Sequence, residues 1–144
     1  MPGRPSSRES AHRNVPTLVG PGACPLPLRI LPDPRRRRAL RSPPDHIIAR
    51  KHRGPTQEDN LAWACYLCNL LKGTDLASVD IETGQVVRLF NPRLDNWAEH
   101  FRLKDGGIVP LTPIGRVTEY LLQFNQPQSM QERRMLIVAG RYPR

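Results

Sequence analysis

The chain is 144 residues long, which suits one domain because single domains commonly hold roughly 100–150 residues. Its formal net charge is +9, and most of that charge lies in residues 1–44, which carry nine arginines against two acidic residues. The longest apolar runs span a few residues, far fewer than the ~20 that cross a bilayer, and no apolar stretch of a secretory signal follows Met1. We therefore expect a cytoplasmic protein with no membrane partner.

Residues 1–44 show no regular spacing of apolar side chains, and they contain ten of the 16 prolines. Proline lacks an amide hydrogen and restricts the backbone, so its recurrence predicts an irregular or disordered segment. The run Arg35–Arg38 has two interpretations, a nucleic-acid-binding arm or a solvated basic linker. The linker is favoured because no aromatic residues are interleaved with the arginines.

The segment that follows predicts a strand, a loop, a second strand and a helix. Residues 45–49 favour a short strand, and residues 50–55 favour a polar loop with a Gly-Pro turn. Residues 61–65 fit a strand with one buried face, and an amphipathic helix fits them almost as well. A tight CxxC knuckle is expected next, before a helix that begins at Asn69 and continues towards Ala77.

The rest of the chain predicts short extended pieces and two closing helices. Residues 86–90 favour a strand after a turn, and residues 108–111 favour another extended piece. The first helix should begin at Thr112, an N-cap followed by proline at the first helical position, and should run to about residue 124. The second should begin with a capping box at Ser129 and end near Gly140.

His46 is the residue of this chain that first suggests catalysis. A histidine beside an acidic residue at a strand end can deprotonate a water for attack on a phosphodiester, although a single histidine is more often structural. Asp45 offers a carboxylate oxygen and Asn69 a carbonyl oxygen, and Mg²⁺ and Mn²⁺ prefer such ligands. The alternatives are a turn acid for Asp45 and a helix-cap residue for Asn69.

Several short motifs occur in one order between residues 45 and 73: Asp45-His46-Ile47-Ile48, Gly54-Pro55-Thr56, Asp59-Asn60-Leu61-Ala62 and Cys65-x-x-Cys68-Asn69-x-x-Lys72-Gly73. Their order resembles the HNH endonuclease family. The similarity to one bacterial branch continues downstream through Asp80-x-Glu82-Thr83-Gly84, Leu89-Phe90-Asn91-Pro92-Arg93, Trp97, His100-Phe101 and Leu111-Thr112-Pro113. We therefore expect an α+β fold, with a ββα-metal (His-Me finger) unit over residues 45–80 and an α+β extension over residues 81–144 packed on it.

The resemblance implies an endonuclease that hydrolyses DNA with the help of a divalent metal. His46 would be the general base, and Asn60 would orient the catalytic loop. Asp45 and Asn69 would bind the catalytic Mg²⁺ or Mn²⁺. No small-molecule cofactor is expected.

DNA is the expected partner, and the expected contacts are Lys72, which would lie near a phosphate, with Arg50 and Lys51. Two other functions stay open. A degenerate, inactive relative would bind nucleic acid through Arg35–Arg38 and Lys72 without cutting it. A thiol redox protein built on Cys65-x-x-Cys68 is less favoured, because no βαβ pattern surrounds the pair.

The cysteines depart from the family pattern. Relatives of this branch carry a second CxxC before the Asp-His pair, and the four thiolates bind a structural zinc. Here Cys65 and Cys68 would supply half of such a site, and Cys24 is the only cysteine upstream. Two thiolates do not complete a tetrahedral zinc site. A small domain that takes folding energy from its zinc would lose stability and activity without the other pair.

A change of reading frame would account for the missing pair. The segment 28–32 can be encoded as CTG CGG ATA CTG CCN, and skipping one base gives TGC GGA TAC TGC, which encodes Cys-Gly-Tyr-Cys. A GC-rich frame read out of register would also yield the composition of residues 1–44. Chance is the alternative explanation, and the codons used from Leu28 to Leu31 in the gene decide between the two.

Overall fold

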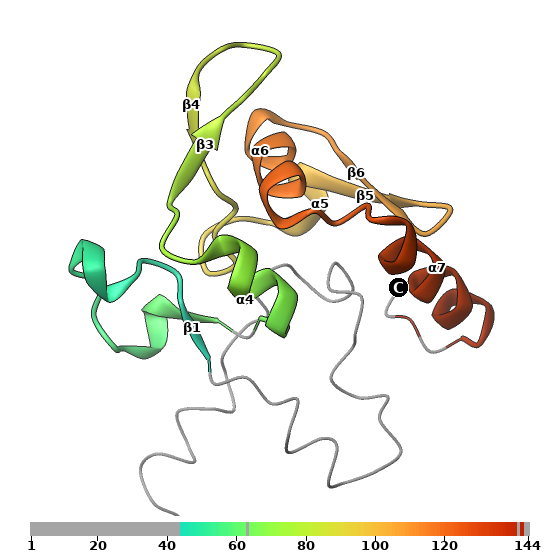
Figure 1. Ribbon diagram of the computed structural model, residues 1–144, viewed down its shortest axis with the longest axis horizontal. Helices are drawn as coiled ribbons and strands as arrows, with labels where there is room; N and C mark the ends of the chain where they lie inside the picture. The colour runs from blue at the N-terminus through green and yellow to red at the C-terminus, as the bar shows by residue number, and fades with distance from the viewer. Residues whose placement is uncertain (1–43, 63, 141, 143–144) are drawn as a thin grey trace, which may run out of the picture.

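The computed structural model describes residues 44–62, 64–140 and 142, so the predicted irregular segment and Cys24 lie outside the described residues. The described part combines α-helices with three two-stranded antiparallel sheets, which confirms the expected α+β class (Figure 1). None of its helices has both the length and the apolarity that a membrane crossing requires.

The first sheet pairs β1 (Asp45–His46) with β2 (Leu61–Ala62), and it places Asp45 opposite Ala62. Two 3-10 turns, η1 (Arg50–His52) and η2 (Glu58–Asn60), lie between the strands. The strand interpretation of residues 61–65 is thus confirmed over the helical one, although the strand stops at Ala62.

Helix α4 (Tyr66–Lys72) begins earlier than predicted. Cys65 is its N-cap, and the amide of Cys68 donates to Cys65 Sγ at 3.4 Å, so the CxxC forms the first turn of the helix rather than a knuckle before it. The helix ends at Gly73, whose φ of +49° suits glycine. The predicted continuation towards Ala77 is therefore wrong.

Ala77 instead opens a hairpin made of β3 (Ala77–Val79) and β4 (Val86–Arg88), which projects from the rest of the fold in Figure 1. The predicted strand over residues 86–90 is shorter in the structure. Leu89 and Phe90 leave the hairpin and are buried at 8% and 5% exposure, because their side chains enter the core.

The C-terminal part adds two short elements that the sequence did not predict, α5 (Trp97–His100) and β5 (Phe101–Lys104). β5 forms a hairpin with β6 (Gly107–Pro110), which corresponds to the predicted extended piece. Asn96 caps α5 by accepting the amide of Ala98 at 3.2 Å. The helix has four residues, which is too short for a periodic spacing of apolar side chains to predict it.

Helices α6 (Pro113–Leu122) and α7 (Pro127–Val138) close the chain. The predicted start of α6 is confirmed, because Thr112 Oγ1 accepts the amide of Gly115 at 3.1 Å. The predicted capping box at Ser129 is wrong. Helix α7 begins two residues earlier, with Pro127 at its first position, and Ser129 is buried inside the helix.

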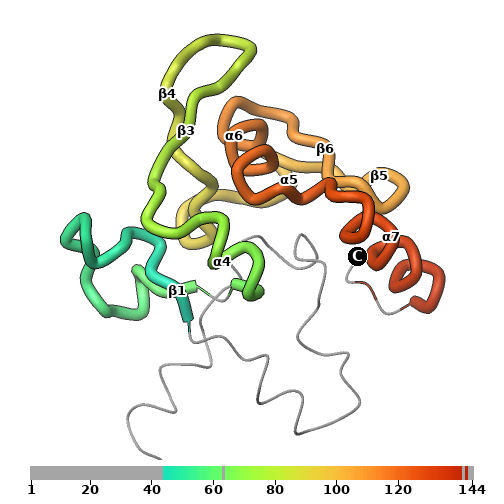
Figure 2. Tube along the Cα trace, viewed as in Figure 1, coloured from blue at the N-terminus to red at the C-terminus, as the bar shows by residue number. Residues whose placement is uncertain are grey.

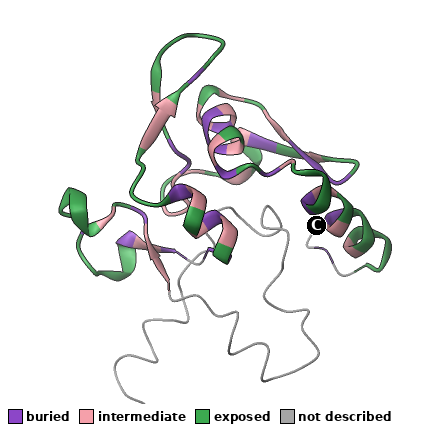
Figure 3. Ribbon diagram, in the orientation of Figure 1, coloured by how far each residue is buried: buried purple, intermediate pink, exposed green. Residues whose placement is uncertain are grey.

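One apolar core joins the N-terminal unit to the C-terminal part. Phe101 is 1% exposed, and its ring lies 5.4 Å from those of Phe90 and Trp97 and 5.9 Å from that of Phe124. The same cluster includes Ile47, Ala62, Ala64, Cys65, Cys68, Ile108 and Leu122. Figure 3 marks buried residues on α4 and α6, the helices that pack on each other in this core. The strands of the first sheet therefore rest on side chains from the second half of the chain.

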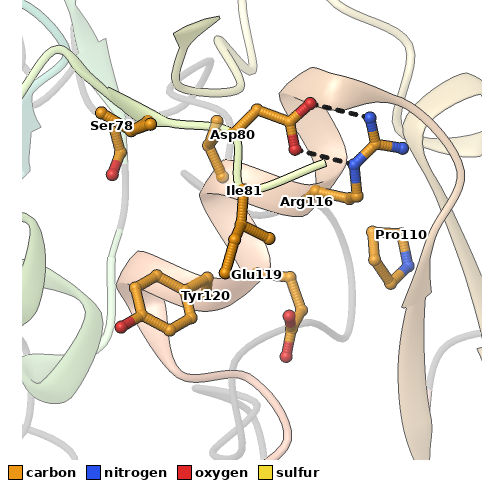
Figure 4. A pocket seen from close by; sticks show the side chains of 9 residues that line it. Ser78, Asp80, Ile81, Pro110, Arg116, Glu119 and Tyr120 are labelled. Carbon is orange, nitrogen blue, oxygen red and sulfur yellow. Dashed lines mark hydrogen bonds and ion pairs between the residues drawn. The ribbon is translucent and has the colours of Figure 1, made fainter. Parts of the chain in front are cut away.

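A buried ion pair joins the β3–β4 hairpin to α6. Asp80 is 1% exposed, and Arg116 donates Nε to its Oδ1 at 2.9 Å and Nη2 to its Oδ2 at 2.8 Å (Figure 4). The Thr83 hydroxyl also donates to Oδ2, at 2.9 Å. The pair lines a cavity of about 540 Å³ between the hairpin and α6. These hydrogen bonds, led by that from Arg116, hold the pKa of Asp80 far below its usual range.

We expect Asp80 to contribute to acid unfolding. Its folded-state pKa lies below the unfolded value of about 3.9, so its stabilising effect is complete above about pH 5 and is lost as the pH falls towards the folded pKa. Melting temperatures of wild type and Asp80→Asn, measured from about pH 7 to about pH 3, should therefore converge in acid. A difference that stays constant over this range would contradict the assignment.

Candidate active site

Strands β1 and β2 and the end of α4 meet around Asp45 and His46, and the trace in Figure 2 shows α4 beside β1. Lys72, the last residue of α4, is 3% exposed. Its Nζ donates to the carbonyl oxygen of His46 at 2.9 Å and lies 3.5 Å from Asp45 Oδ2. The helix is thus fastened to the strand that carries both candidate residues.

Asp45 has a carboxylate oxygen whose hydrogen-bonding capacity is unused. Its side chain is 18% exposed, and Oδ2 is buried without a hydrogen bond in the part of the chain that the structure describes. A buried carboxylate oxygen is costly unless a cation or a donor compensates it. Lys72 supplies one positive charge, and a hard divalent cation would suit the same oxygen. Asp45 therefore has the donor type that the expected metal needs, and its role as a ligand stays a prediction.

Asn69 lies on the same helix as Lys72, three residues before it. Residues three apart share one face of a helix, and the Lys72 face is the one that contacts β1. The Asn69 side chain is half-buried. Asn69 therefore lies on the same face of α4 as Lys72, and its role as a second metal ligand stays a prediction.

His46 makes a side-chain hydrogen bond across the loop that follows β1. Its Nε2 lies 2.8 Å from Thr56 Oγ1, and this contact is exposed to solvent. The imidazole is thus held at one nitrogen while a water molecule can still reach the ring.

Asn60 fixes the shape of that loop. It is 6% exposed, its Oδ1 accepts the amide of Ile48 at 2.9 Å, and its Nδ2 donates to the carbonyl oxygens of Ile48 and Pro55, both at 2.9 Å. The bonds tie the start of the loop, just after His46, to its end, just before Thr56. A residue bonded in this way can orient the loop, which is the role expected for Asn60.

The basic turn η1 is on the surface between these elements. Arg50, Lys51 and Arg53 are exposed, and none of them forms an ion pair within residues 44–62, 64–140 and 142. Arg53 has a left-handed backbone, φ 65°, and the chain turns at this residue before Gly54. The expected DNA contacts Arg50 and Lys51 are therefore available. Arg53 was not predicted, although the basic run from residue 50 to residue 53 signals it.

Lys72 requires a correction to the sequence-based expectation of a phosphate contact. Its amine is buried and is used inside the protein by Asp45 and by the His46 carbonyl. A lysine in this place holds two active-site residues together, and the structure does not present it to a phosphate. This contact could not be predicted from the sequence, because His46 and Lys72 are 26 positions apart along the chain.

The two cysteines of α4 do not make a zinc site by themselves. Cys68 is 1% exposed, and burial raises the pKa of its thiol to about 12. Among the described residues, no group of three or more His, Cys, Asp or Glu side chains could hold a metal ion. A closed zinc site needs four ligands, so Cys65 and Cys68 alone would supply half of one.

Comparison with known families identifies the segment that contains this site. Residues 43–75 match the family model described as HNH endonuclease. This segment is an HNH domain. Both strands of the first sheet, η1, η2 and α4 lie within the match, so all the site residues described above belong to the HNH domain.

The HNH domain indicates a nuclease-type function in general, since HNH proteins are generally endonucleases that use a divalent metal and act on nucleic acid. The expected resemblance to the HNH endonuclease family is confirmed over residues 43–75. The chain matched no curated protein and no solved structure.

Proposed function

We propose that this protein is a divalent-metal-dependent HNH endonuclease that hydrolyses phosphodiester bonds of DNA. The observation that supports it most is the joint placement of Asp45 and His46 on β1, beside a loop pinned by Asn60 and a helix end fastened by Lys72. The arrangement lies inside the HNH domain.

In the proposed reaction His46 removes a proton from a water molecule, and the water oxygen forms a bond to phosphorus as the ester P–O bond breaks. The leaving oxygen then takes a proton from solvent. Asp45 and Asn69 would hold Mg²⁺ or Mn²⁺, which supplies positive charge where negative charge develops in the transition state. Asn60 keeps the loop in one conformation, so that the imidazole is in place before substrate binds.

The exposed cations of the turn η1 and of its C-cap would hold the substrate next to this centre. The exposed cations Arg50, Lys51 and Arg53 follow His46 by four to seven residues on the same loop. Cations on a surface turn bind phosphates without reading sequence, and their contribution weakens with added salt. DNA is the proposed substrate because its phosphates present negative charge at regular spacing along each strand.

His46→Ala is the variant that tests this function. Without the imidazole, nicking of supercoiled plasmid in Mg²⁺ or Mn²⁺ should fall by about 100-fold or more, since a positioned general base contributes roughly 10²–10⁴-fold. The rate is measured as conversion of supercoiled to open-circular plasmid on a gel.

His52→Ala is the matched control, because His52 is an exposed histidine on the same loop and has no proposed role. It should cut at the wild-type rate. Nicking that survives in His46→Ala would overturn the proposal. Wild-type protein that shifts DNA on a gel and never cuts it would instead support a degenerate, nucleic-acid-binding relative.

A further inference from the structure

The outer edge of β2 is covered by a side chain from outside the HNH domain. In the part of the chain that the structure describes, β1 and β2 form a sheet of their own, so β2 has a strand neighbour on one side only. The amide of Ile47 donates to the carbonyl of Asn60 at 2.9 Å. Successive carbonyls of an extended chain point to opposite edges, so the next carbonyl, that of Leu61, points away from β1. Arg93 donates to it from Nε at 3.2 Å and from Nη2 at 3.1 Å.

This carbonyl belongs to the residue that faces His46 across the strand pair, since the register places Leu61 opposite His46. Each strand of the sheet has two residues, and so short a strand pair is marginally stable by itself. Hydrogen bonds from a charged donor are stronger than those between neutral groups, and a guanidinium that donates twice also fixes an orientation. Arg93 therefore restricts the movement of β2, the strand against which Asp45 and His46 lie.

The turn over residues 91–95 holds Arg93 in place. Asn91 Oδ1 accepts the amide of Arg93 at 2.9 Å, and Asp95 Oδ2 accepts the amide of Asn91 at 2.7 Å. Arg88, the last residue of β4, donates Nη1 to Asp95 Oδ2 and Nη2 to Asp95 Oδ1, both at 2.7 Å. All four residues follow residue 75, where the HNH match ends. The C-terminal part of the chain thus holds β2 through a series of hydrogen bonds as well as through the apolar core.

We infer that Arg93 is a positioning residue of this nuclease, which acts on Asp45 and His46 through the backbone of β2. The inference rests on the proposed function, because the reaction gives Asp45 and His46 their roles. An arginine that binds a DNA phosphate presents its donors to solvent. The Arg93 side chain is half-buried, and two of its nitrogens are used by the Leu61 carbonyl. These contacts favour the positioning role over a DNA contact.

Hydrogen exchange of backbone amides in the full chain tests the contact without depending on catalysis. Arg93→Met keeps an apolar stem and removes every donor, whereas Arg93→Lys keeps the charge and loses the planar fork. In Arg93→Met, exchange of the Ile47 amide should quicken about 10-fold, the size expected when hydrogen bonds from a charged donor are lost. The amide of Ile108, which donates to Asn125 Oδ1 at 2.8 Å in the C-terminal part, should exchange at the wild-type rate.

Kinetics show whether the movement of β2 reaches the chemical step. In plasmid nicking, kcat of Arg93→Met should fall about 10-fold or more with KM unchanged, since a small displacement of reacting groups has effects of that size. Arg93→Lys should lie between Arg93→Met and the wild type. The salt dependence of DNA binding should stay as in the wild type. Arg102→Met is the matched control, because Arg102 is an exposed arginine on β5. It should change neither Ile47 exchange nor kcat.

Unchanged exchange of Ile47 in Arg93→Met, or an equal increase at Ile47 and Ile108, would overturn the inference. A raised KM with a shallower salt dependence would also overturn it, because Arg93 would then be a phosphate contact. The two proposals fail separately. Faster exchange of Ile47 alone, in a protein whose wild type never nicks DNA, supports the contact of Arg93 with β2 and contradicts the nuclease. Wild-type kcat in Arg93→Met supports the nuclease and contradicts the role of Arg93.

Discussion

Replacing Lys72 by methionine should destabilise the protein by about 3 kcal/mol, because breaking a buried ion pair leaves the other charge without compensation. Methionine fills most of the same volume, so the loss comes from the ammonium. Asp45 Oδ2, which has no hydrogen bond among the described residues, would lose the cation 3.5 Å away, and the His46 carbonyl would lose its donor at 2.9 Å. The 18% exposure of the Asp45 side chain places the effect at the lower end of the range for buried pairs.

Urea unfolding of wild type, Lys72→Met, Asp45→Asn and the double variant gives the energy of the pair as a double-mutant cycle. The double variant should be more stable than Lys72→Met alone, since it no longer holds an uncompensated carboxylate. Equal stability of those two proteins would show that the lysine acts only through the His46 carbonyl. Lys72→Arg is the charge-retaining control, and it should lose less stability than Lys72→Met.

Local signals in the sequence predicted the elements whose ends are set by adjacent residues. Thr112-Pro113 fixes the start of α6 because a hydroxyl cap and a proline act within one turn. The α4 start was missed because a sulfur acts as the cap at Cys65, which the capping rules do not favour. The capping pattern at Ser129 predicted a helix start that the structure does not have, because Ser129 is buried inside α7.

The candidate site divides in the same way. Asp45, His46 and Asn60 were predicted because they belong to short motifs that follow one another in a recognisable order. The structure brings them to one strand pair and its loop. The contacts of Lys72 and Thr56 could not be predicted, because they depend on how α4 and the turn return to β1 over 26 and 10 residues. Periodicity and propensity describe neighbours along the chain, and neither describes a contact of that separation.

Gly54→Ala should destabilise the protein by more than about 3 kcal/mol, a size that single substitutions reach only when backbone or core must move. A β-carbon at this position would overlap the carbonyl oxygen of Ile48 and lie 2.9 Å from Asn60 Nδ2. The first obstacle is backbone, so no change of rotamer relieves it. The loop would have to open, and the three hydrogen bonds of Asn60 would be lost with it.

Gly84→Ala is the matched control for this variant. Gly84 has a φ of +69° and open space where a β-carbon would lie, so the substitution costs only the left-handed backbone penalty of about 1–2 kcal/mol. Unfolding of both variants in urea, with plasmid nicking at a temperature where both are folded, separates a general loss of stability from damage to the loop. Gly84→Ala should nick at the wild-type rate. Gly54→Ala should nick more slowly, because His46 and Thr56 lie at opposite ends of the loop that the methyl group forces open. If both variants lose the same stability and keep the same activity, the loop is not held by that close approach.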